Sequence, residues 1–206
     1  MTDIKPTRSE LIKLKNKIKL AQSGYKLLKK KRDGLILEFF EILKETKSVR
    51  KEMTEKYKDA VKKINIARII DGDIVIKSVS MAIKDKPVVD VENKNIMGVV
   101  VPNIHSEHVK KEILYRGYGL LNTSVAINEA ATAYEELLEY IILTAEVETS
   151  MMRLLEEIDK TKRRVNALEF EVIPKLISTK NFIELRLEEQ ERETIFRSKR
   201  IKKKRV

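Results

Sequence analysis

The sequence predicts a mainly α fold in which two very long antiparallel helices form a coiled coil, with a small head containing a β-hairpin between them. Apolar residues recur at alternating steps of three and four over two long stretches, as in coiled coils. Only 6 Gly and 4 Pro occur in 206 residues, so the elements must be few and long. With 36% charged and 5% aromatic residues, the chain suits helices that bury a narrow stripe rather than a thick globular core. We expect one domain, with the first long helix in 1–70, the head and turn region in 71–119, and the second long helix with a basic tail in 120–206.

The first helix is expected to begin in the stretch PTRSELIKL, where Thr7 and Glu10 have the spacing of a capping box. Its apolar seam then holds for about seven heptads and is interrupted only by Arg32, Thr46 and Lys56. The predicted seam consists of Leu11, Leu14, Ile18, Ala21, Tyr25, Leu28, Leu35, Phe39, Ile42, Val49, Met53 and Ala60.

The helical pattern stops near residue 71, and a β-like segment follows. Residues 74–83 are rich in β-branched side chains, 88–91 and 96–101 continue this character, and Asp-Gly, Lys-Pro and Met-Gly punctuate them. We expect two or three short strands that include a hairpin. A short helix over 107–115 is then expected to end at the glycines of the stretch RGYG.

The second helix is expected from about residue 120 to about residue 197, which makes it longer than the first by about four turns. Its last segment should extend beyond the first helix, where i,i+4 ion pairs between Glu188 and Arg192 and between Glu193 and Arg197 would support it. Aligning residue 68 with residue 120 gives the expected register, which places Leu14 opposite about Pro174. The predicted seam includes Ile127, Ala131, Tyr134, Leu138, Ile141, Ala145, Met152, Leu155, Val165, Leu168, Val172, Leu176, Ile183 and Leu187.

Two positions inside these helices are unusual. Because the seam continues past Pro174, we expect this proline to remove the backbone bond to the carbonyl of Phe170 and to kink the helix rather than end it. Gly24 lies inside the first helix, where it costs about 1 kcal/mol relative to Ala. It is either tolerated there or marks a close approach of the partner helix, helped by Ala21 one turn earlier.

Catalytic, cofactor and metal sites find little support in the sequence. The chain has no Cys, and its only two histidines, His105 and His108, read as a surface pair near the head rather than half of a zinc site. It contains neither a GxxxxGK[ST] phosphate loop nor a GxGxxG turn. It also has no run of about 18 apolar residues and no apolar core at its N-terminus. We therefore expect a soluble, cytosolic, non-enzymatic protein without a cofactor or metal.

Basic residues give the chain a net charge of +11, and seven of them lie in the last ten positions, which hold no acid. The tract KKKRD at 29–33 and this tail could be solvated faces, nucleic-acid contacts or docking sites for an acidic protein surface. Aromatic residues that would stack on single-stranded bases are not interleaved with them. A solvated face is the simplest interpretation, and an acidic protein partner is the next.

Four stretches resemble, in the same order, blocks of the D subunit of archaeal A-type and vacuolar-type rotary ATPases. They are PTRSELIKLKNKIKLAQSGYKLLKKKRDGL, RGYGLLNTS, EEIDKTKRRVNALEFEVIP and LEEQERE. The motif RRVNALE followed by IP is specific, because a generic coiled coil has no reason to repeat it. Residues 71–101 match this family in position and character but not as a sharp motif.

The resemblance implies a central-stalk rotor shaft that couples ion-driven ring rotation to ATP synthesis or hydrolysis and has no catalytic residues. Its partners would be the catalytic A and B subunits, three of each in the head, a small F subunit along the shaft, and a funnel-shaped subunit on the membrane rotor ring. The resemblance places such a shaft in a peripheral complex on the cytoplasmic side of the cell membrane, with no nucleic acid and no insertion into the membrane. We expect basic side chains to meet acidic surfaces of the head through screened contacts. These residues are Arg163, Arg164, Lys199, Arg200, Lys202, Lys203, Lys204 and Arg205.

Two other classes of protein remain open. A prefoldin-type chaperone also has two helices around a β element, but its helices are shorter and their tips display apolar residues, whereas this chain ends in charge. A basic coiled-coil scaffold or nucleic-acid binder would show a salt-sensitive affinity for DNA or RNA that is independent of base sequence.

Overall fold

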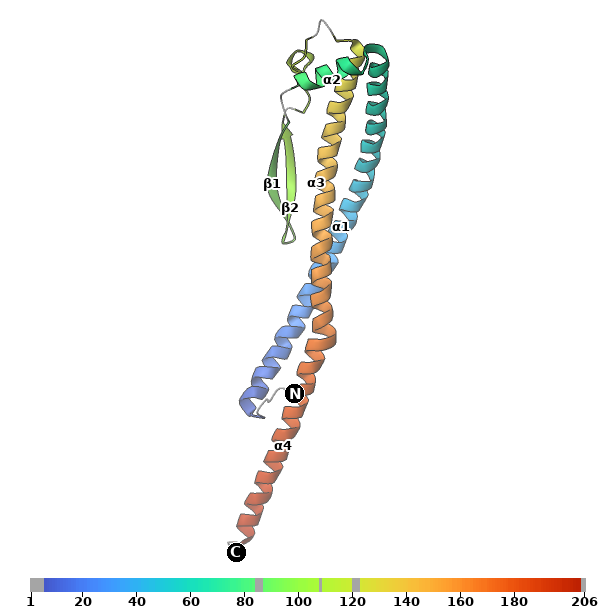
Figure 1. The fold of residues 1–206 in the computed structure, drawn as a ribbon. Coiled ribbons are helices and arrows are strands. Elements are labelled where there is room, and N and C mark those ends of the chain that lie inside the picture. The colour runs from blue at the N-terminus through green and yellow to red at the C-terminus, as the bar shows by residue number, and fades with distance from the viewer. Residues whose placement is uncertain (1–5, 84–86, 108, 120–122, 205–206) are drawn as a thin grey trace. The chain divides into compact units, whose positions relative to one another are not determined.

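The computed structural model describes residues 6–83, 87–107, 109–119 and 123–204. Its elements are α1 (Arg8–Asp71), α2 (Asp73–Ala82), strands β1 (Val88–Ile96) and β2 (Val99–Glu107), the 3-10 helix η1 (Ile113–Tyr115), α3 (Val125–Ala167), the π-helix η3 (Leu168–Val172) and α4 (Ile173–Lys204) (Figure 1). The predicted fold class is confirmed, because long helices dominate the chain and a two-stranded antiparallel hairpin lies between them.

The chain divides into two compact units, which are described separately. Residues 1–34 and 158–206 form one unit, here called the terminal unit, and residues 35–157 form the other, here called the central unit. The terminal unit therefore contains the start of α1, the end of α3, η3 and α4. The central unit contains the rest of α1 and α3 together with α2, the hairpin and η1.

In the terminal unit, α1 starts with Thr7 as its N-cap, and the Thr7 half of the predicted capping box forms. The Glu10 backbone N–H donates to Thr7 Oγ1 at 3.3 Å, and the Leu11 N–H donates to the Thr7 carbonyl at 3.0 Å. The Glu10 carboxylate pairs with Lys13 at 2.7 Å. The Thr7 hydroxyl thus satisfies one backbone donor that the first turn of a helix leaves unpaired, that of Glu10, and the Thr7 carbonyl accepts the first regular bond of the helix.

Two ion pairs show that α1 and α4 run antiparallel in the terminal unit. Arg8 lies 2.6 Å from Glu191 and Lys15 lies 3.0 Å from Glu184, so a step of seven along α1 matches a step of seven back along α4. The expected register placed Leu14 opposite Pro174, whereas the next residue, Lys15, pairs with Glu184. The expected register is therefore wrong by about three turns. It was counted from residues 68 and 120, whereas α1 ends at Asp71 and α3 begins at Val125.

The predicted seam of α1 is confirmed along its whole length. Every predicted position is buried or half-buried, and Leu35 and Ala60 have no exposed surface. In the central unit, Ala60 packs with Ala133 and Leu137 of α3, and the half-buried Met53 covers this cluster. Small residues at the seam let the two helices approach closely there.

The predicted seam of α3 is correct at Ile127 but is wrong by about one position in the rest of the central unit. Tyr134, Ile141 and Met152 are 39%, 43% and 60% exposed, whereas neighbouring small and polar residues are buried. The predicted face favoured the largest apolar side chains, but close packing against α1 favours compact ones. The buried residues of α3 in this unit are Ile127, Ala130, Ala133, Leu137, Thr144, Val147, Ser150 and Leu154.

The expected strand over 74–83 is wrong, because α2 occupies this segment. Val75, Ile76, Val79 and Ala82 are half-buried, and this spacing places them on one face of a helix. Gly72 precedes α2 with a φ of 82° and so turns the chain between α1 and α2. Burial of one helical face outweighs the β propensity of the branched side chains.

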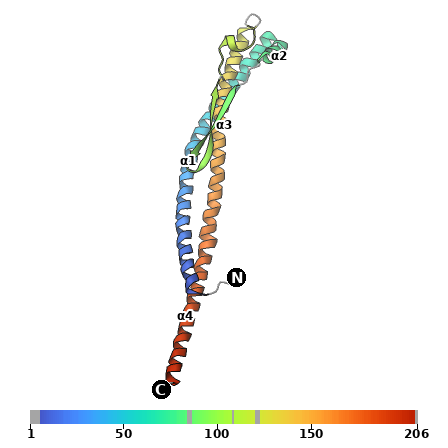
Figure 2. The same ribbon diagram turned by 90° about the vertical axis from the view of Figure 1, so that its left-hand side faces the viewer.

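The predicted hairpin is confirmed. β1 and β2 pair with Ile96 opposite Val99, and Met97 and Gly98 both have positive φ, at 50° and 85°, as a tight turn of right-handed twist requires. The Gly98 N–H donates to Asn95 Oδ1 at 2.8 Å. The hairpin runs alongside α3, where the Arg153 guanidinium donates to the Val100 carbonyl at 2.8 Å (Figures 1 and 2).

The expected helix over 107–115 is also wrong. β2 continues to Glu107, and within the described residues 109–115 only Ile113–Tyr115 are helical, as a single 3-10 turn. His105 is exposed on β2 and lies 3.0 Å from Asn103, while His108 lies outside the described residues.

The helical run of α3, η3 and α4 continues past Pro174 to Lys204, so it is longer than α1 as predicted. Arg8, the first residue of α1, pairs with Glu191, and all residues from 191 to 204 are exposed. The predicted pairs of this last segment form, with Glu188–Arg192 at 3.9 Å and Glu193–Arg197 at 3.2 Å.

Candidate functional site

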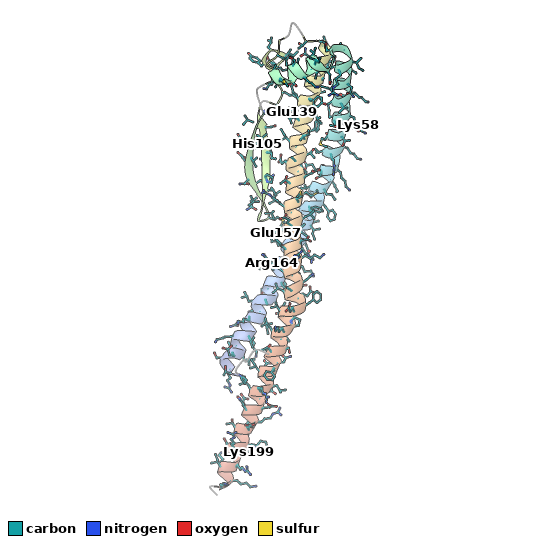
Figure 3. The ribbon with its side chains drawn as sticks, in the orientation of Figure 1. Lys58, His105, Glu139, Glu157, Arg164 and Lys199 are labelled. Atoms are coloured by element: carbon teal, nitrogen blue, oxygen red, sulfur yellow. The ribbon has the colours of Figure 1, made fainter. Side chains whose placement is uncertain are left out.

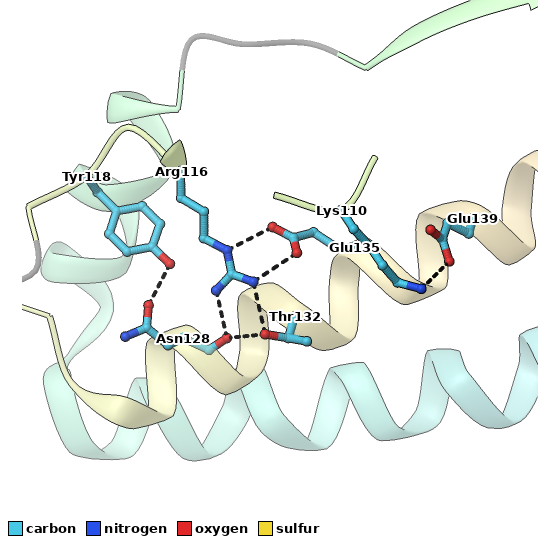
Figure 4. Close-up of polar contacts among 7 residues, drawn as sticks. All are labelled: Lys110, Arg116, Tyr118, Asn128, Thr132, Glu135 and Glu139. Atoms are coloured by element: carbon cyan, nitrogen blue, oxygen red, sulfur yellow. Dashed lines mark hydrogen bonds and ion pairs between the residues drawn. The ribbon is translucent and has the colours of Figure 1, made fainter. Parts of the chain in front are cut away.

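A buried arginine organises the polar contacts of the central unit. Arg116 follows η1 and is only 5% exposed. Its Nε donates to Glu135 Oε1 at 2.9 Å, and its Nη2 donates to Glu135 Oε2 at 2.8 Å and to Thr132 Oγ1 at 3.0 Å. Its Nη1 donates to the Asn128 carbonyl at 3.2 Å (Figure 4). The guanidinium therefore fastens the segment after the hairpin to the first three turns of α3.

Burial lowers the pKa of Arg116, but its hydrogen bonds with Glu135 and Tyr118 outweigh this effect and raise the pKa above its ordinary value. The Tyr118 hydroxyl donates in turn to Asn128 Oδ1 at 2.8 Å. Among the described residues, no buried side-chain nitrogen or oxygen atom lacks a hydrogen-bond partner, so the cluster holds the chain in place rather than offering free groups for chemistry.

Two further ion pairs extend this arrangement along α3. Lys110 lies 2.7 Å from Glu139, and Lys56 of α1 lies 2.6 Å from Glu136. The hydrogen bond from Lys56, together with its charge, lowers the pKa of Glu136, and the same contact raises the pKa of Lys56. Two consecutive acids of α3 thus bind two different segments. Glu135 pairs with Arg116 of the segment after η1, and Glu136 pairs with Lys56 of α1.

Gly117 allows Arg116 to reach this position. Its φ is +86°, in the left-handed region that residues with a Cβ rarely adopt, and a Cβ there would lie 3.3 Å from the Ala82 carbonyl oxygen. The space beside Gly24 is open instead, since a Cβ there would meet no atom within 4 Å. This openness favours simple tolerance of Gly24 over a close helix approach.

The basic residues predicted to make contacts are exposed but do not form one cluster. Arg163 and Arg164 lie near the end of α3, and Lys199 lies near the end of α4, about 50 Å further along the helical run (Figure 3). Arg200, Lys202, Lys203 and Lys204 share the exposed end of α4 with Lys199, and Arg205 lies outside the described residues. The structure thus offers two separate basic surfaces.

The central unit exposes apolar side chains around the turn between α1 and α2. Ile69 and Ile74 are each 85% exposed, Ile70 is 61% exposed and Met81 is 81% exposed. Ile69, Ile70 and Ile74 flank the turn at Gly72, whereas Met81 lies near the far end of α2. Such a concentration of apolar side chains at one turn is typical of a surface that another protein covers.

Two cavities of the central unit have linings unlike those of an active site. One of about 250 Å³ is lined mostly by apolar residues of α1, α2 and α3, and its lining contains no carboxylate or basic group. Another of about 240 Å³ is lined by Lys111, Arg116 and Glu135, and the last two bind each other. Among the described side chains, no group of three or more histidines and carboxylates could hold a metal.

Within the described ranges, none of the helices combines the length and the apolar character needed to cross a bilayer. Sequence reasoning missed Arg116 and Glu135 as a pair. The signal was an arginine directly before Gly117 in the RGYG stretch, but nothing in the sequence showed which acid of α3 it meets.

Comparison with known proteins gives a consistent result over nearly the full chain. The family model of the ATP synthase D subunit matches residues 10–203. The D subunit of the A-type ATP synthase of Methanococcoides burtonii is 61% identical, with 98% of each chain covered. Proteins of the same name from Methanoregula boonei and Methanosarcina acetivorans are 55% and 57% identical, covering 98% and 97% of this chain and 97% and 96% of their own.

Proposed function

The chain belongs to the family of ATP synthase D subunits, and from this premise we propose that it is the central-stalk rotor shaft of an A-type ATP synthase. In this role it couples ion-driven rotation of a membrane ring to ATP synthesis or hydrolysis in a head of A and B subunits. It has no catalytic group of its own and belongs to a peripheral complex on the cytoplasmic side of the cell membrane.

One structural observation carries this proposal beyond the family membership: α4 continues past the start of α1. The segment after Glu191 is helical, exposed and rich in basic residues, and it has no α1 residue beside it. A pair of helices of unequal length is asymmetric, and a three-fold head needs an asymmetric shaft to hold its three sites in different states. Charged, exposed surfaces also suit a shaft that turns without adhering.

The surfaces of the chain suggest a place for each partner. The A and B subunits receive the basic end of α4 and the surface of Arg163 and Arg164 through contacts with acidic side chains. The funnel-shaped subunit of the ring covers the apolar residues around Ile69 and Ile74. The small F subunit binds along the shaft. The segments 1–70, 71–119 and 120–206 correspond to the first shaft helix, the ring-side head and the second shaft helix.

Co-purification tests this function. The chain is mixed with the A, B and F subunits of the same organism and separated by size exclusion in low salt. We expect one complex with a single copy of the chain for three A and three B subunits. A truncated chain that lacks residues 192–206 should bind the F subunit but associate more weakly with the A and B subunits. A chain that remains free in the presence of all partners would contradict the proposal.

No observation on the described residues favours a prefoldin-type chaperone or a nucleic-acid scaffold. The family match over residues 10–203 supports the shaft instead.

A further inference from the structure

The buried positions of the second helix shift by one residue in the middle of the terminal unit. Thr161, Val165 and Leu168 are buried or half-buried and follow steps of four and three. Continued at the same steps, the pattern would reach 172, 175, 179, 182 and 186. The packed positions come one residue later instead, at Ile173, Leu176, Lys180, Ile183 and Leu187. Of the positions in the continued pattern, 172, 175, 182 and 186 are exposed and Thr179 is half-buried.

The π-helix η3 lies where this shift occurs. The Ile173 N–H donates to the carbonyl of Leu168, five residues earlier, whereas an α-helix bonds residues four apart. A π turn holds one residue more than the α turn it replaces. One residue corresponds to about 100° of rotation in an α-helix. The extra residue in the apolar pattern and the extra residue in the turn therefore cancel.

Pro174 is placed where this turn can accommodate it. Proline has no N–H, and in a regular helix its ring presses against the carbonyl four residues earlier, here that of Phe170. The wider turn over Leu168–Val172 lies directly before it. Phe170 itself is 74% exposed, so its side chain does not hold the turn open from the α1 side.

We propose that η3 is a phase-setting element, which rotates α4 by one residue so that Leu176, Ile183 and Leu187 face α1. The apolar pattern, rather than the proline, requires the turn. For the shaft, a point that rests on the proposed function, this element fixes the angle at which the basic end of α4 is presented relative to α1. Loss of the element would turn that end by about a quarter of a revolution.

The test uses thiol cross-linking of the full chain, which has no native Cys. Lys15→Cys and Glu184→Cys replace two side chains whose Nζ and Oε1 atoms lie 3.0 Å apart. Cross-linking by a short bis-maleimide reports whether the same face of α4 still lies against α1. Three backgrounds are compared with the native one: Pro174→Leu alone, Pro174→Leu with Glu171 deleted, and Pro174→Leu with Ser23 deleted. Glu171 lies in η3, and Ser23 is an exposed residue of α1, so the last variant is the matched control.

We expect the first two variants to cross-link within about twofold of the native yield. Deleting Glu171 removes the extra residue, so a regular α-helix without the proline keeps the downstream seam on α1. Deleting Ser23 rotates the part of α1 that precedes it, including position 15, by one residue relative to α4, and no π turn in α1 compensates for this rotation. Its cross-linking should fall at least about tenfold, and its Tm should fall by about 5 °C or more.

Two results would overturn the proposal. Loss of cross-linking in the Glu171 deletion, to the level of the Ser23 control, would mean that the turn does not compensate an extra residue. Loss in Pro174→Leu alone would mean that the proline sets the phase. Both are measured without any other component of an ATP synthase, so neither depends on whether the chain is a rotor shaft.

Discussion

Arg116 and Glu135 form a two-pronged ion pair inside the central unit, with N–O distances of 2.9 and 2.8 Å. The arginine lies just after η1 and the acid lies on α3, so the pair fastens the segment that follows the hairpin to the helix. Because Arg116 is only 5% exposed, few water molecules can reach its guanidinium and solvate the charge in place of Glu135. The stability of the central unit should depend on this contact more than on any exposed pair.

Arg116→Met should lower the free energy of unfolding by about 3 kcal/mol or more, since it leaves the Glu135 carboxylate without its partner in a partly buried site. Urea unfolding followed by circular dichroism measures the loss. Arg50→Met is the matched control, because Arg50 and Glu148 form an exposed pair at 3.8 Å, and its effect should stay below about 1 kcal/mol. Equal effects of the two variants would contradict the assigned importance of Arg116.

Two glycines should respond oppositely to alanine. Gly117→Ala forces a left-handed backbone on a residue with a Cβ and brings that atom to 3.3 Å from the Ala82 oxygen, so it should destabilise by about 1–2 kcal/mol. Gly24→Ala fills open space in a helix and should stabilise by up to about 1 kcal/mol. Thermal unfolding of both variants measures the contrast. A destabilised Gly24→Ala would indicate a close approach of another helix.

The Lys56–Glu136 pair should make stability depend on pH in a defined way. The contact lowers the pKa of Glu136, so its contribution is complete above the unfolded value of about 4.3 and is lost as pH falls through the lowered pKa. It raises the pKa of Lys56, so that contribution is complete below about 10.4 and is lost as pH rises through the raised pKa.

The Tm difference between the native chain and Lys56→Met should therefore be largest from about pH 5 to pH 10 and should shrink on both sides. Lys62→Met, at an exposed position of the same helix, is the control and should show no such profile. A difference that stays constant down to about pH 2.5 would mean that the loss comes from packing of the lysine stem instead.

The basic end of α4 should affect binding to the head without affecting folding. Glutamine at Lys199, Arg200, Lys202, Lys203 and Lys204 removes charges from exposed side chains, so the Tm should change by less than about 2 °C. The affinity for the A and B subunits should fall several-fold in low salt and become less sensitive to added salt. Pull-down over a salt series measures both.

Glutamine at five exposed lysines of α1 in the central unit is the matched control for charge. These are Lys44, Lys47, Lys51, Lys58 and Lys62. If the control weakens binding as much as the tail variant, net charge rather than the end of α4 attracts the head.

Sequence patterns predicted the features that depend on local periodicity. The seam of α1, the hairpin, the continuation past Pro174 and the pairs Glu188–Arg192 and Glu193–Arg197 all follow from spacing within one element, and all are present. The segment of α2 was misread as a strand because its β-branched residues match both a strand and a buried helical face.

Features that depend on how segments meet were not predictable in the same way. A heptad seam repeats every seven residues, so it pairs well in several registers, and the pairing of Lys15 with Glu184 is set by where α1 and α3 end and begin. The choice of Glu135 for Arg116 depends on the path of the intervening loop. The role of η3 required the burial of residues on both sides of it.

Direct observation of rotation tests the central claim that this chain is a shaft. Ser78→Cys, an exposed position of α2, carries a bead or gold particle in a complex with the A, B and F subunits that is held to a surface through the head. On addition of ATP, we predict that the probe turns in one direction and pauses at thirds of a revolution, as a head with three catalytic sites requires. A probe that remains fixed relative to the head while the complex hydrolyses ATP would contradict the account.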